Sequence, residues 1–163
     1  MKTIFTLFVA TIGLLSCNNN IKEIEIDRTA GEWVSSGAKY VIGSDEKVVI
    51  VKKLIENYAA LDAEGVFTNT RDSLRFFPFN SKTSVMLTVD NLKEMFSSYD
   101  SIVSKPIYYL PYDLEGVRSI VQVTSTETKY NKNGTVEEDL LLEKFIFGKD
   151  GKIHTVRQWR AAW

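Results

Sequence analysis

The chain has 163 residues, of which 44% are hydrophobic and 25% are charged, and its formal net charge is −1. This length predicts a single domain with a sizeable core. The nearly balanced charge provides no basic surface that would favour nucleic acid as a partner.

The first 16 residues have the pattern of a secretory signal. Lys2 is followed by an apolar run over 4–15, which is too short to span a bilayer. The run ends Leu14-Leu15-Ser16-Cys17 and resembles the bacterial lipoprotein signal, with the only cysteine of the chain at its end. The resemblance implies cleavage before Cys17 and acylation, palmitate included, at its sulfur and new amino group. The alternative is an ordinary secretory signal that leaves a free thiol, a liability in an oxidising compartment.

Residues 17–44 are predicted to be a tether and a packing arm. Three asparagines follow Cys17. Apolar and charged residues alternate over Ile21–Ile26, as in a short strand. Trp33 and Tyr40 are large apolar residues of a kind that is unusual in a linker. The folded domain is then expected over 45–163.

Two helices are expected at the start of that domain. Ser44, followed by Asp45 and Glu46, is typical of a helix N-terminus, and apolar residues at helical spacing predict a helix over 45–62. A helical turn is expected near 63–68. Thr88 caps a second predicted helix, over 89–103, whose expected buried face is Val89, Leu92, Phe96, Tyr99 and Val103.

The remaining segments favour strands. They are predicted over 73–79, 107–112 and 117–130, with Pro78 at an edge or at a strand end. Residues 136–163 read as an antiparallel hairpin around Gly148-Lys149-Asp150-Gly151. Helices followed by strands predict an α+β fold in which helices cover one face of a curved antiparallel sheet.

The first strand of that hairpin carries the most chemically suggestive position. Side chains alternate along a strand, so one face carries Leu141, Glu143, Phe145 and Phe147. A carboxylate therefore stands in an otherwise apolar row.

The order of these elements resembles the nuclear transport factor 2-like superfamily, which includes the ketosteroid isomerases and polyketide-cyclase-like proteins. The resemblance lies in Glu56–Gly65 as a first helix and in Phe145–Ile153 as the last hairpin, and it extends over residues 45–163. It implies a cone-shaped curved antiparallel sheet packed against two long N-terminal helices. Such a cone encloses a pocket, often in a homodimer, for which the sheet face is the candidate contact.

The resemblance carries over to three positions. Ketosteroid isomerases use a tyrosine on the first helix and a protonated aspartate on the penultimate strand as an oxyanion hole, with an aspartate as base. Tyr58 stands where the tyrosine stands, and Glu143 where the protonated acid stands. The base position falls on Phe77, which cannot take a proton. Steroid isomerisation by that route is therefore not expected.

The same residues have structural interpretations. Tyr58 lies on the apolar stripe of its helix, so one interpretation is that it only packs in the core. The pattern places Val156, Gln158 and Arg160 on the pocket side of the last strand, and an ion pair between Glu143 and Arg160 would keep the carboxylate charged. Without a cation, enclosure would raise the pKa of Glu143 and keep it protonated.

Three functions remain open on this basis. The first is a lipid-anchored protein of the bacterial cell envelope that binds a small, partly apolar ligand. The second is a lyase, isomerase or cyclase with Glu143 as its acid. The third is an interaction domain that uses the sheet face or Trp159 and Trp163. The predicted pocket residues are Tyr58, Phe77, Leu141, Glu143, Phe145, Val156, Gln158 and Arg160. No cofactor or metal site is expected, because the only histidine, His154, has no companion ligands in the pattern.

Overall fold

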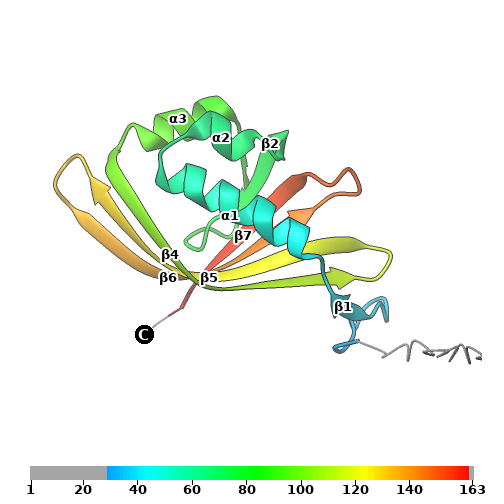
Figure 1. Cartoon of the computed structure of the whole chain (residues 1–163). Helices are drawn as coiled ribbons and strands as arrows, with labels where there is room; N and C mark the ends of the chain where they lie inside the picture. The colour runs from blue at the N-terminus through cyan, green and yellow to red at the C-terminus, as the bar shows by residue number, and fades with distance from the viewer. Residues whose placement is uncertain (1–28, 162–163) are drawn as a thin grey trace, which may run out of the picture.

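The computed structural model describes residues 29–161, and these form one curved sheet with three helices on its concave side (Figure 1). In chain order the elements are β1 (Tyr40–Ile42), α1 (Asp45–Ala59), α2 (Ala63–Phe67), β2 (Thr70–Phe77), β3 (Val85–Leu87), α3 (Val89–Phe96), β4 (Tyr99–Leu114), β5 (Arg118–Asn131), β6 (Val136–Phe147) and β7 (Ile153–Ala161). The predicted α+β class with a curved sheet is confirmed. Cys17, the Ile21–Ile26 segment and Trp163 lie outside the described residues.

The sheet has seven strands in the order β1-β4-β5-β6-β7-β2-β3. Strands β4 to β7 follow one another as antiparallel neighbours, as the run of predicted strands indicated. Strand β2 instead pairs in parallel with β7. Parallel neighbours need a long crossover, and here everything from β3 to β6 lies between the two strands. The prediction of an entirely antiparallel sheet is therefore wrong at this one junction.

Helix α1 begins and ends through local hydrogen bonds. The Ser44 hydroxyl accepts the Glu46 amide at 3.1 Å, as the capping pattern predicted. At the other end the amide of Asp62 donates to the carbonyl of Asn57 and that of Leu61 to Tyr58, which is the Schellman arrangement. Leu61 takes the left-handed position with φ 58°. Glycine is the usual residue at such a position, because a side chain makes a positive φ unfavourable. Leu61 packs against the core, and this contact offsets the unfavourable backbone conformation.

The second predicted helix is much shorter than expected. Helix α3 begins as predicted, with a reciprocal capping box between Thr88 and Asn91, but it ends at Phe96. From Tyr99 onward the chain pairs with β5, so residues 99–103 belong to β4. Tyr99 and Val103 continue the helical spacing only by coincidence. The expectation of two long helices is therefore wrong: α1 has 15 residues, and α2 and α3 have five and eight.

The predicted arm contributes an edge strand. Strand β1 pairs with the end of β4, Tyr40 opposite Leu114. Gly43, which follows β1, lies close to the backbone of β4. A Cβ atom at this position would be 2.8 Å from the Tyr112 amide nitrogen. Trp33 is half exposed and Val34 almost fully exposed. The arm pairs with the domain through β1, and the Lys39 carbonyl beside it accepts the Glu115 amide at 3.0 Å.

The core lies between the helices and the concave face of the sheet. Its buried residues are Val48, Val51, Leu54, Ile55, Ala63, Val66, Leu74, Leu92, Phe96, Ile102, Val121, Val123, Phe145, Phe147, Ile153 and Val156. They come from α1, α2, α3 and all the central strands, so every layer contributes to one continuous core.

Candidate functional site

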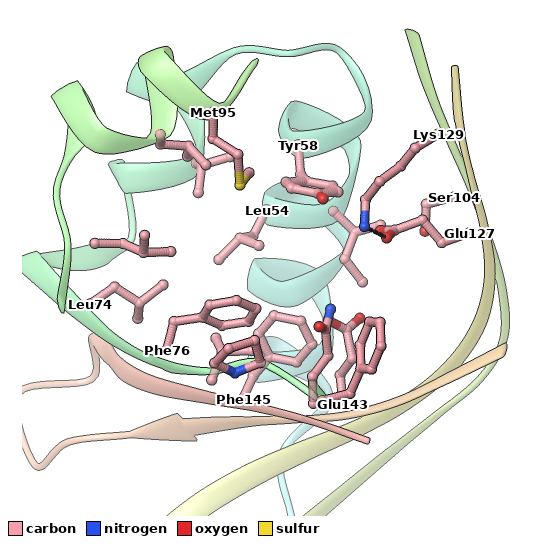
Figure 2. A pocket seen from close by; sticks show the side chains of 18 of the residues that line it. Leu54, Tyr58, Leu74, Phe76, Met95, Ser104, Glu127, Lys129, Glu143 and Phe145 are labelled. Carbon is pink, nitrogen blue, oxygen red and sulfur yellow. Dashed lines mark hydrogen bonds and ion pairs between the residues drawn. The ribbon is translucent and has the colours of Figure 1, made fainter. Parts of the chain in front are cut away.

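A cavity of about 230 Å³ lies between the three helices and the concave face of the sheet. One side of it is apolar, and Figure 2 shows Leu74, Phe76 and Met95 there, with Ser104, Glu127 and Lys129 opposite. The apolar lining is Leu54, Ile55, Val66, Phe67, Leu74, Phe76, Pro78, Phe79, Leu87, Leu92, Met95, Phe145 and Val156. A mostly apolar hollow with a few polar groups at one end is the usual form of a small-molecule site.

The register of β5, β6 and β7 brings together the side chains at the polar end of the cavity. Gln158 of β7 stands opposite Glu143 of β6, and Val123 of β5 stands on the other side of Glu143. Because side chains alternate, Glu127 of β5 lies on the same face as Val123, two rows further along. The polar lining is Tyr58, Asn80, Tyr99, Ser104, Glu127, Lys129, Glu137, Glu143 and Gln158.

Glu143 is the acid of this cavity whose pKa is raised into the neutral range. Burial and the nearby Glu127 carboxylate raise its pKa to about 7. The Gln158 amide donates a hydrogen bond to Glu143 Oε1 at 2.9 Å, and this bond together with the Lys129 charge opposes the increase. Near neutral pH the side chain therefore exists in both its protonated and its ionised form, so it can donate or accept a proton.

Tyr58 reaches the cavity from α1. Its ring meets Phe96 edge to face, with centroids 5.5 Å apart. Burial, followed by the Glu127 and Glu143 charges, raises the pKa of Tyr58 well above its ordinary value. The phenol thus stays neutral and keeps its proton for hydrogen bonding. Both proposed roles of this residue, core packing and cavity contact, are present together.

Lys129 and Glu127 form the buried ion pair of the polar end. The ammonium and Glu127 Oε1 are 2.6 Å apart, and the two side chains are 13% and 5% exposed. Burial lowers the pKa of Lys129, but the Glu127 carboxylate outweighs it and the net effect is an increase. The lysine charge is therefore held and largely neutralised by Glu127.

Five of the eight predicted pocket residues line the cavity: Tyr58, Glu143, Phe145, Val156 and Gln158. Phe77 does not, because Leu74 and Phe76 are the cavity-facing residues of β2. Phe77 lies on the opposite face under the Arg157 guanidinium, which is 4.0 Å from its ring centroid. Phe76 cannot take a proton either. Leu141 is fully buried on the Glu143 face of β6 but is outside the cavity wall.

Arg160 is the third exception, and the predicted pair with Glu143 does not form. Arg160 stands opposite Leu141, and its Nε lies 2.6 Å from Asp139 Oδ1. This contact is an ion pair without hydrogen-bond alignment. The register follows from the turn after Phe147 and from an irregularity beside His154, which together place Gln158 and not Arg160 beside Glu143.

The pocket predicted from the sequence does not include Glu127 and Lys129, which both line the cavity, although the sequence holds a signal for them. Both belong to the same alternating set of β5 as Val121 and Val123, whose side chains are fully buried. Reading that alternation to its end would have placed two charged groups on the core face of the strand.

Two kinds of feature are absent from residues 29–161. No three His, Cys, Asp or Glu side chains of the described chain are grouped as metal ligands would be. None of its helices has the length and apolarity needed to cross a bilayer. His154 hydrogen bonds to Thr155 Oγ1 at 2.8 Å, and burial followed by Arg71 and Arg118 lowers its pKa.

The fold is that of nuclear transport factor 2-like proteins. A protein of this type from Burkholderia pseudomallei, of unknown function, aligns with a TM-score of 0.54 at 13% identity, over 72% of this chain and 92% of its own. A ketosteroid isomerase-like protein from Erwinia carotovora atroseptica aligns with a TM-score of 0.53 at 12% identity, over 71% and 94%. The epoxide hydrolase/cyclase-like enzyme SalBIII, which has a role in pyran ring formation in the polyether salinomycin, aligns with a TM-score of 0.55 at 15% identity, over 72% and 92%. No family model and no curated protein matches the sequence.

Proposed function

We propose that this protein binds a small, partly apolar molecule in the cavity between α1, α2, α3 and the concave face of the sheet. The observation that carries the proposal is a hollow of about 230 Å³ with an apolar side and a polar end. Side chains do not fill it, although the cores of folded domains normally leave few voids larger than a water molecule. We also propose that the sheet and helices enclose this cavity as a cone, as the resemblance to nuclear transport factor 2-like proteins implies.

Blocking the cavity tests the proposal. Leu87 of β3 is half buried and lines the cavity, so Leu87→Trp should fill part of it. A thermal-shift screen of small apolar alcohols, amines and acids should raise the Tm of the unmodified protein and leave that of the blocked variant unchanged. Val49→Trp, on the exposed side of α1, is the matched control. Equal Tm increases in all three proteins would place binding elsewhere and refute the proposal.

We further propose that Cys17 is acylated and holds the domain at a bacterial membrane, on the periplasmic or outer side of the envelope. The support is the Leu14-Leu15-Ser16-Cys17 pattern after a short apolar run. Cys17→Ser should abolish incorporation of a clickable palmitate analogue and move the protein from the membrane fraction to the soluble fraction. Labelling that persists in the Cys17→Ser variant would refute the anchor.

A second candidate function is acid catalysis of the isomerase, lyase or cyclase type. The specific observation is Glu143, whose pKa is raised to about 7 beside the neutral phenol of Tyr58 in an accessible cavity. Two proton donors could polarise a carbonyl group, which would acidify its α-hydrogens. On β2 the residues that face the cavity are Leu74 and Phe76, and neither can act as a base.

Hydrogen exchange tests this candidate without a known substrate. The protein should accelerate deuterium uptake at the α-carbon of 2-tetralone in D₂O, measured by NMR, and Glu143→Gln should remove the acceleration. Acceleration should also decrease above pH 7, where Glu143 loses its proton. Equal rates with the two proteins would rule out Glu143 as an acid.

The convex face of the sheet is our candidate contact between two copies of the chain. Tyr108, Leu110 and Trp159 are 42%, 50% and 43% exposed there. Tyr108, Thr124, Leu142 and Trp159 form one row across four strands. Exposed apolar residues gathered on a sheet face favour association.

A further inference from the structure

We infer that the ligand of this cavity is an organic cation: an apolar body that carries one protonated amine, with the amine placed between Glu143 and the aromatic side chains at the polar end. This inference rests on the proposed binding function and adds the chemical class of the ligand. It follows from the charge of the cavity wall, from the partners of Glu143 and from the kind of surface beside it.

The cavity wall has an excess of negative charge. Its charged side chains are Lys129 against Glu127, Glu137 and Glu143. Lys129 is already held by Glu127 at 2.6 Å. Glu137 is at the exposed end, where Asn131 donates to it at 3.1 Å. The neighbouring Asp139 forms an ion pair with Arg160, so these two residues together add no net charge.

Glu143 is an acid of the cavity that has no ion-pair partner among the described residues. In the described chain its side-chain hydrogen bond comes from the neutral amide of Gln158, and no lysine or arginine within residues 29–161 forms an ion pair with it. Glu143 therefore lacks an ion-pair partner among the described residues, and its hydrogen bond comes from a neutral group.

The surfaces around Glu143 suit an ammonium group. Tyr58 and Tyr99 line the polar end, and Phe76 and Phe145 continue the wall. A cation near aromatic faces gains a further attraction once it leaves water. An anionic ligand would instead meet Glu127 and Glu143, and a neutral one would leave the ionised Glu143 without a counter-charge.

Binding of a cation should be linked to the proton on Glu143. The groups that face this carboxyl are Tyr58 of α1, Tyr109 of β4, Glu127 and Lys129 of β5, and Gln158 of β7. An ammonium ligand would lower the pKa of Glu143 from about 7, so binding at pH 7 should release about half a proton. Affinity should accordingly increase between pH 6 and pH 8.

Isothermal titration of the purified full chain with three matched probes tests the inference. These are phenethylamine, 2-phenylethanol and 3-phenylpropionate, which share an aromatic body and differ in charge. Phenethylamine should bind about 10-fold to 100-fold more tightly than 2-phenylethanol, as expected for a hydrogen bond to a charged group. Titrations in phosphate and Tris at pH 7 should show the release of protons.

Two variants connect the preference to one carboxylate. Glu143→Gln should bring phenethylamine to within about threefold of the alcohol and stop the proton release. Glu138→Gln, which removes the same charge from an exposed position on the opposite face of β6, should leave both unchanged. A circular dichroism melt checks that each variant is folded.

The outcomes separate the two claims. If 2-phenylethanol or 3-phenylpropionate binds as tightly as the amine, or if Glu143→Gln keeps the preference, the cation inference is overturned while the binding function stands. If none of the three probes binds, and the thermal-shift screen is also negative, both are overturned.

Discussion

At the scale of single residues, Glu143 determines the character of the site. Burial and Glu127 raise its pKa to about 7, and Gln158 is its hydrogen-bond partner. Sequence alone placed Glu143 in an apolar row of one strand, and that placement is confirmed, because period-2 alternation needs no tertiary information. Its partner could not be predicted, since a cross-strand neighbour depends on the length of the turn and on the irregularity beside His154.

The first prediction concerns stability and pH. In the unfolded chain Glu143 has the ordinary pKa of 4.5, against about 7 when folded. Between those values the folded state binds more protons, so the contribution of this group is complete below pH 4.5 and is lost as the pH rises to about 7. Relative to Glu143→Gln, the wild type should lose up to about 3 kcal/mol of unfolding free energy between pH 4.5 and pH 8. Parallel pH profiles in denaturant titrations would contradict this.

The second prediction concerns Arg160. Asp139 is 7% exposed and Arg160 is 57% exposed, so removing the arginine leaves a nearly buried carboxylate without its cation. Arg160→Met should cost about 1–3 kcal/mol, below the value for a fully buried pair because Arg160 is half exposed. A double-mutant cycle with Asp139→Asn should show coupling of about 1 kcal/mol or more, and the same cycle with Glu143→Gln should show almost none. The reverse ranking would restore the Glu143–Arg160 pair.

At the scale of elements, local signals predicted the starts of α1 and α3 and the strands β2, β5, β6 and β7, but not β1, β3, the first part of β4 or the end of α3. The caps at Ser44 and Thr88 act through atoms a few residues away, so sequence shows them directly. The end of α3 is instead a competition between helix and sheet, and pairing of Tyr99 with Asn131 of β5 decides it. Long-range pairing of this kind leaves no mark in the helical spacing of residues 89–103.

The third prediction follows from the short length of α3. A helix of eight residues depends heavily on its cap, and here Thr88 and Asn91 satisfy each other's backbone amides. Thr88→Ala should lower the free energy of unfolding by about 1 kcal/mol. Because Leu92 and Met95 of α3 line the cavity, ligand binding should weaken as well. Thr88→Ser, which keeps the hydroxyl, is the control and should behave like the wild type.

At the scale of the whole molecule, one side of the sheet is filled by helices and the other remains open. The helices cover the concave face (Figure 1), whereas apolar side chains remain exposed on the convex face. The resemblance to nuclear transport factor 2-like proteins predicted this arrangement of layers. It could not predict the size of the cavity, which depends on how α2, α3 and β3 pack over the edge of the sheet.

The fourth prediction concerns association through that convex face. Leu110 is 50% exposed beside Tyr108, and a charge there would be desolvated in a dimer. Sedimentation velocity should show a dimer in the wild type and a monomer in Leu110→Glu, while Val49→Glu on the exposed side of α1 should keep the wild-type value. A wild type that sediments as a monomer throughout the micromolar range would contradict the contact.

The central claim is that the cavity binds a small, partly apolar molecule, and methyl NMR tests it most directly. The methyl groups of Leu54, Leu87, Leu92, Met95 and Val156 surround the cavity, whereas Leu110 and Ile107 are exposed on the sheet. Titration with phenethylamine or 2-phenylethanol should shift the first group in a saturable way and leave the second unchanged. Saturable shifts confined to Leu110 and Ile107, or none at any cavity methyl with either probe, would contradict the account.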